Sequence, residues 1–97
     1  MSTQTHATVL DYLLRAGDAF TEVLDLYGPP VTATHEVRAQ RLVAYADRCA
    51  LLAARTAGRD PALLEHAVEV RDMASRAQIL LDAIHRSREA TAPSRVA

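Results

Sequence analysis

The chain has 97 residues, a formal net charge of −1 and a charged fraction of 24%. A chain of this length forms one domain with a modest hydrophobic core. Its near-neutral charge excludes a general electrostatic attraction to nucleic acids or anionic membranes. Cys49 is the single cysteine, so no disulfide can form within the chain. We therefore expect a reducing, cytoplasmic location.

The first expected helix covers residues 8–27. Thr8 is a candidate N-cap, and Gly28-Pro29-Pro30 ends the pattern because Pro cannot continue the helical hydrogen-bond ladder. Residues 1–7 are expected to form a flexible N-terminus without the basic segment of a signal peptide. One arc of this helix is apolar and is expected to be buried. It comprises Val9, Leu13, Ala16, Phe20, Val23, Leu24 and Tyr27.

The second expected helix covers residues 34–57. Thr34 is its candidate N-cap, Glu36 lies in the first turn, and Gly58 ends it. Its buried arc consists of small side chains, which allow a neighbouring backbone to approach closely. The arc comprises Ala39, Leu42, Val43, Ala46, Ala50 and Ala53, with Cys49 at its edge.

The third expected helix covers residues 61–87, because Asp60 is a good N-cap and Pro61 suits the first helical position. A single domain over residues 8–88 and a flexible tail over 89–97 follow. Short connections between helices favour antiparallel neighbours. The sequence therefore predicts an all-α fold, an antiparallel up-down-up three-helix bundle. No apolar run is long enough to cross a membrane.

The third helix has two apolar stripes where a three-helix monomer needs one. The first stripe is expected to face the core and comprises Leu63, Val70, Ala74, Ala77, Leu81 and Ile84. The second comprises Leu64, Val68 and Ile79, and it is displaced by more than about 90° around the helix axis. A wide core could absorb this second stripe, or it could be a subunit interface. We predict the interface, with dimerisation through the third helix.

A polar line formed by Arg71, Gln78, Asp82 and His85 runs between the two stripes. Polar groups flanked by apolar surface usually pair with one another or with a partner. The same guanidinium, amide and imidazole groups could instead hold a small anion, in a ligand-binding or catalytic site formed at a dimer interface.

No motif predicts a metal site, a cofactor or a catalytic residue. Asp82 and His85 are three residues apart, a spacing that helical metal sites use, but the acidic residues of the first helix are expected to point outward. Cys49 has no neighbouring base in sequence, which favours a packed thiol over a nucleophile.

Charge is sorted by helix. Residues 8–27 hold four acids and one Arg, whereas residues 34–59 hold five Arg and two acids. The acidic stripe on the first helix comprises Asp11, Asp18, Glu22 and Asp25, and the basic stripe on the second comprises Arg41, Arg48 and Arg55. Each stripe lies opposite its helix's apolar arc and is expected to face solvent as a partner surface. Regularly spaced Arg could also follow phosphates, but aromatic stacking residues are absent from the stripe.

These features predict a small non-enzymatic protein that acts through protein–protein association, as a homo-oligomeric adaptor, regulator or assembly subunit. The expected partners are a second copy of the chain and another protein. Two alternatives remain open at this point: the anion-binding or catalytic site at a dimer interface, and a weak nucleic-acid-binding accessory.

Overall fold

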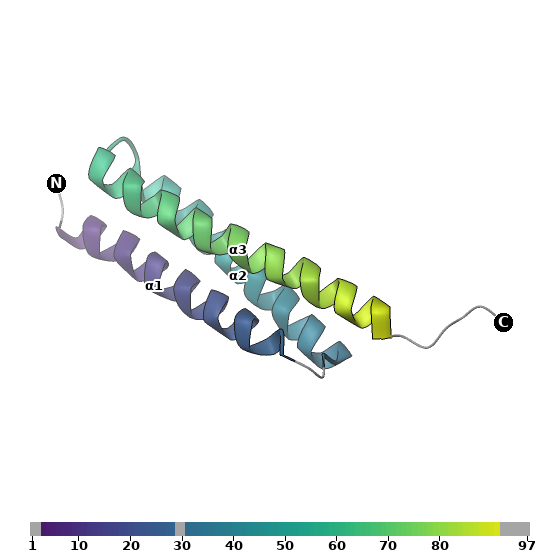
Figure 1. The fold of residues 1–97 in the computed structure, drawn as a ribbon. Coiled ribbons are helices and arrows are strands. Elements are labelled where there is room, and N and C mark those ends of the chain that lie inside the picture. Colours follow the sequence, from purple (N-terminus) through teal and green to yellow (C-terminus); the bar gives the residue numbers. More distant parts are fainter. Residues whose placement is uncertain (1–2, 29–30, 92–97) are drawn as a thin grey trace.

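A computed structural model of the chain describes residues 3–28 and 31–91. The described residues form three helices, α1 (Thr3–Leu26), α2 (Ala33–Ala57) and α3 (Pro61–Thr91), and contain no strand. Figure 1 shows the helices side by side, with the chain reversing direction between successive helices. Each helix packs against both of the others. The predicted all-α three-helix bundle is therefore confirmed.

The start of α1 differs from the prediction. The helix begins at Thr3, so Thr8 is not its N-cap, and residues 3–7 belong to the helix and not to a flexible terminus. The Thr8 hydroxyl instead donates a hydrogen bond of 2.8 Å to the carbonyl oxygen of Gln4, one turn earlier. A threonine in mid-helix can satisfy its hydroxyl in this way, which is why its presence alone does not mark a helix start.

Helix α2 begins one residue earlier than predicted, and its N-cap is Thr32 in place of Thr34. The Thr32 side chain accepts a hydrogen bond from the backbone nitrogen of His35, and the His35 ring accepts one from the Thr32 backbone. This reciprocal pair is a capping box with His at the third helical position. The predicted end at Ala57 is confirmed, and Gly58 follows with a φ of 59°.

The predicted start of α3 is confirmed. Asp60 accepts a hydrogen bond of 3.0 Å from the backbone nitrogen of Ala62, as an N-cap side chain does. The helix continues to Thr91, beyond the predicted end at residue 87, so residues 89–91 are helical and not part of a flexible tail. The rest of that predicted tail, residues 92–97, lies outside the described residues.

The core is made largely of alanine and valine. All the residues of the predicted α2 arc, including Cys49, are buried, as are five of the six predicted core residues of α3. The α1 arc was partly wrong: Leu24 and Tyr27 are exposed, while Ala19 is buried and Tyr12 packs against the core. Contact with two neighbouring helices shifts the buried face of α1 around its axis, which the period of the pattern does not specify.

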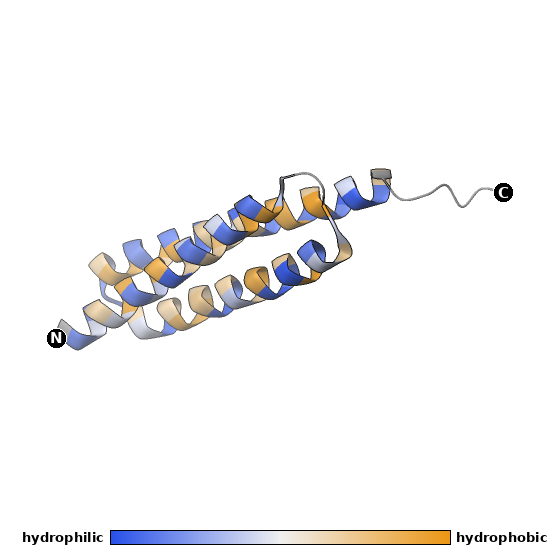
Figure 2. Cartoon of the chain, turned by 90° about the horizontal axis from the view of Figure 1, so that it is seen from below, coloured by the Kyte–Doolittle hydropathy of each residue, from blue (hydrophilic) through white to orange (hydrophobic). Residues whose placement is uncertain are grey.

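Apolar and polar residues alternate along each helix in Figure 2, as expected for helices that bury one face. No polar or charged residue among those described is buried. None of the three helices, over its described length, has an apolar stretch that could span a membrane.

Candidate interaction surface

The second apolar stripe of α3 is not absorbed by the core. Val68 and Ile79 are 66% and 64% exposed, and Leu64 is 38% exposed. Leu51 of α2, which is 54% exposed, lies beside this stripe in a shallow groove between the two helices. The groove has a volume of about 380 Å³. This groove and the exposed apolar side chains beside it make up the candidate interaction surface.

The floor of the groove is built from small residues. Its buried lining residues are Ala50 of α2 and Ala67 and Ala74 of α3, whereas Ala54 and the larger apolar side chains that line it are exposed. Alanines lower the surface between the two helices, so a side chain from another molecule could enter between the rims. We refer below to this groove together with Ile79 as the α2–α3 face.

Two opposite charges also line the groove, Asp47 from α2 and Arg71 from α3. Neither side chain forms a hydrogen bond or an ion pair with any residue in the described parts of the chain. Arg71 was predicted from the sequence as a residue of the polar line, whereas Asp47 and Leu51 were not predicted as part of this surface. A signal for Leu51 was available, because Val37, Ala44 and Leu51 recur every seven residues on the side of α2 away from its alanine arc.

The predicted polar line does not act as one unit. The Gln78 side-chain nitrogen donates a hydrogen bond of 3.0 Å to Asp82. Arg71, nearly two turns before Gln78, takes no part in that pair. His85 turns toward α2, where its Nδ1 lies 2.6 Å from Glu36 Oε2, so it does not pair with Asp82.

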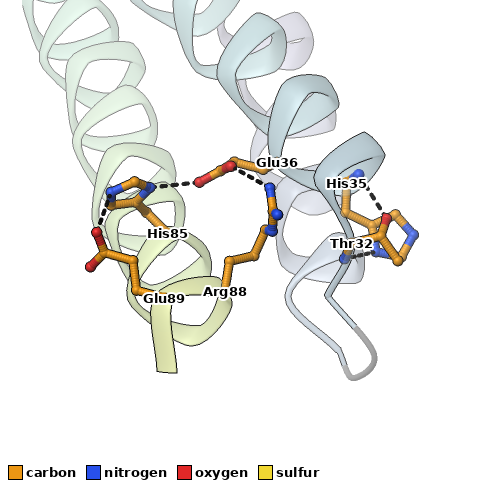
Figure 3. Close-up of polar contacts among 6 residues, drawn as sticks. All are labelled: Thr32, His35, Glu36, His85, Arg88 and Glu89. Atoms are coloured by element: carbon orange, nitrogen blue, oxygen red, sulfur yellow. Dashed lines mark hydrogen bonds and ion pairs between the residues drawn. The ribbon is translucent and has the colours of Figure 1, made fainter. Parts of the chain in front are cut away.

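Glu36 joins the first turn of α2 to the C-terminal part of α3, as Figure 3 shows. Its second carboxylate oxygen accepts a hydrogen bond of 2.9 Å from Arg88, and the Nε2 atom of His85 lies 3.3 Å from Glu89. The hydrogen bond to Glu36, followed by the charge of Glu89, raises the pKa of His85. The hydrogen bond from His85 is also the main reason that the pKa of Glu36 is lowered. Sequence spacing gave no signal for this cluster, because Glu36 and His85 are 49 residues apart.

The acidic and basic stripes are exposed, as predicted. Asp11 of the acidic stripe and Arg48 of the basic stripe line the same cleft between α1 and α2. Glu22 forms an ion pair of 2.7 Å with Arg38 of α2, and Asp11 forms one of 2.7 Å with Arg15. The α1–α2 face therefore carries charges of both signs.

The floor of that cleft holds Cys49, whose thiol is buried. Burial raises the pKa of the Cys49 thiol, which disfavours the reactive thiolate. Tyr45, a residue that the sequence analysis did not single out, accepts a hydrogen bond of 3.2 Å from Arg15 above it. Among the residues that the structure describes, no three His, Cys, Asp or Glu side chains form a group that could hold a metal ion.

Comparison of this chain with protein families, with curated proteins and with solved structures found no match. Its function is therefore inferred from the chemistry of its surfaces.

Proposed function

We propose that this chain is a small non-enzymatic protein that acts through protein–protein association, and that it forms a homodimer through the α2–α3 face. As a dimer it would serve as an adaptor, a regulator or an assembly subunit. The single observation that supports this proposal best is the exposure of Leu51, Val68 and Ile79, each more than half exposed, on one side of the bundle. We also propose a cytoplasmic location, in keeping with the lone free Cys49.

A second copy of the chain is the partner that this face fits best. A two-fold symmetric interface uses the same patch on both subunits, so the patch must complement itself. The α2–α3 face has apolar rims beside a floor of alanines, and an unpaired Arg71 beside an unpaired Asp47. The rims of one copy can thus pack on the floor of the other, and Arg71 of one copy can pair with Asp47 of the other.

The anion-binding alternative has less support. His85 and Gln78 already bind carboxylates, those of Glu36 and Asp82, so these groups are not held open for a ligand. Nucleic-acid binding has less support as well, because Asp11 of the acidic stripe lines the same cleft as Arg48 of the basic stripe and would repel the same phosphates. The charged α1–α2 face remains available for a further protein partner, bound through complementary charges.

The dimer is tested by sedimentation equilibrium of the wild type and of the double variant Val68→Glu, Ile79→Glu. We expect the wild type to be a dimer and the double variant to be a folded monomer. Burying an unpaired carboxylate at the interface should reduce the free energy of dimerisation by about several kcal/mol. Both side chains are largely exposed in the monomer, so circular dichroism should show unchanged helicity.

The matched control is the double variant Leu14→Glu, Leu24→Glu. These leucines are 69% and 48% exposed on α1, outside the α2–α3 face, and the same two charges are added. We expect this control to remain dimeric. A wild type that stays monomeric at high concentration would contradict the proposal, and so would a Val68, Ile79 variant that dimerises as well as the control.

A further inference from the structure

We infer that the two copies pack with α3 of each against α2 of the other, around a two-fold axis parallel to the helices, so that Arg71 of one copy pairs with Asp47 of its partner. This inference rests on the proposed homodimer and adds its geometry. The two α2–α3 hairpins would then form a four-helix core at the interface, with α1 of each copy on the outside.

The level of each residue along the bundle follows from the contact between Glu36 and His85. Glu36 contacts His85 across two antiparallel helices, and residues 47–54 of α2 line the groove together with residues 64–75 of α3, which gives about the same register. Asp47, eleven residues after Glu36, therefore lies level with Ala74, eleven residues before His85. Rotation about an axis parallel to the helices leaves levels unchanged. The partner's Asp47 thus lies three residues, or about 4.5 Å along the axis, from Arg71, which an arginine side chain spans.

The apolar side chains interlock in the same arrangement. Leu51 lies level with Val70, so the partner's Leu51 falls between Val68 and Arg71. The partner's Ala44 lies level with Ala77, two residues from Ile79, and its small side chain leaves room for the isoleucine. Ile79 of α3 thereby meets a small side chain of the partner's α2, and the partner's Leu51 enters between two side chains of α3, as in helix packing generally.

Helix direction favours this arrangement too. Because α2 and α3 run antiparallel within one copy, α3 also runs antiparallel to the partner's α2. All neighbours in the four-helix core then alternate in direction, as in up-down bundles, and the helix dipoles oppose one another.

The competing arrangement packs the two α3 helices against each other in opposite directions. Matching Leu64 of one copy with the partner's Ile79 would place the two-fold axis next to residue 71. Arg71 would then face the partner's Arg71 across the axis. Like charges at an interface oppose association, whereas the first arrangement gives Arg71 an acidic partner.

The inference is tested with two single variants, Arg71→Glu and Asp47→Arg, studied alone and mixed. Alone, each variant would place two like-charged pairs in its homodimer, and we expect dimer dissociation constants to rise about tenfold or more. In an equimolar mixture, the two substituted side chains meet at one contact with their charges exchanged, and the unchanged Arg71 and Asp47 meet at the other. The mixed dimer has opposite charges at both contacts and should form with nearly wild-type affinity.

Native mass spectrometry, with one variant carrying a mass tag, measures the mixed dimer directly. Pairing of Arg71 with Asp47 within a single chain would not be restored by mixing, so restoration reports contact between chains. Single variants that dimerise like the wild type, or a mixture that gains no mixed dimer, would overturn this geometry and leave the homodimer standing. A wild type that is monomeric would instead overturn the proposed function itself.

Discussion

The Nδ1 atom of His85 lies 2.6 Å from Oε2 of Glu36, and this contact connects the beginning of α2 to the C-terminal part of α3. Arg88 binds the other carboxylate oxygen of Glu36. The carboxylate is therefore held between an imidazole and a guanidinium at the end of the bundle where α1 turns into α2. Because His85 makes this inter-helix contact, it does not pair with the other residues of the polar line predicted on α3.

This contact predicts a pH dependence of stability. The raised pKa of His85 adds stability below the ordinary histidine value of 6.5, which is lost as the pH rises through the raised pKa. The lowered pKa of Glu36 adds stability above its ordinary value of 4.5, which is lost as the pH falls through the lowered pKa. The contact should therefore contribute most between these two ordinary values.

The corresponding measurement is the melting temperature of His85→Gln and wild type as a function of pH. We expect the variant to melt lower than the wild type at about pH 5.5, and the difference to shrink by about pH 8.5. His6→Gln, which removes a histidine from the opposite end of the bundle, is the control. All melts need one fixed protein concentration, because oligomers melt at temperatures that depend on it. A difference that is constant across this range would argue against the charged pair.

The N-cap of α2 gives a matched pair of threonine variants. Thr32→Ala removes the side chain that accepts the hydrogen bond from the His35 backbone, and we expect it to cost about 1 kcal/mol. Thr34→Ala lies inside the helix, where alanine has the better propensity, so its effect should be within about 0.5 kcal/mol or stabilising. Chemical denaturation measures both. Equal losses for the two variants would show that Thr32 is not the cap.

Two glycines should respond in opposite directions to replacement by alanine. Gly58 has a φ of 59° and a ψ of −118°, a conformation that residues with a side chain adopt only with strain. Gly58→Ala should destabilise the protein by about 1–3 kcal/mol. Gly17 lies within α1, and a Cβ atom there would meet nothing within 4 Å. Gly17→Ala should stabilise by about 0.5–1 kcal/mol. The free energies of unfolding of both variants, measured by chemical denaturation, test these predictions. A Gly58→Ala variant with unchanged stability would contradict the positive φ at residue 58.

Several features of the fold were determined by local sequence. Gly58 and Asp60-Pro61 marked the boundary between α2 and α3 correctly, because a positive φ and an N-cap depend on a few neighbouring residues. The prediction that the alanine-rich arc of α2 is buried was also correct, because every residue on that face of the helix is buried. The exposure of the second stripe on α3 agrees with one of the two possibilities that the sequence left open.

Other features were decided only by tertiary structure. Thr32 and Thr34 are equally good caps by residue type, and the extended backbone at Thr32 selects it. Leu24 and Phe20 both fit the apolar arc of α1, yet Leu24 is exposed while Phe20 packs against the core, because the neighbouring helices cover only part of that arc. Glu36 contacts His85, and Asp47 and Arg71 line one groove. Both arrangements depend on the axial offset between α2 and α3. Periodicity defines the face that a helix buries, but the position and level of its neighbours come from packing of side chains far apart in the chain.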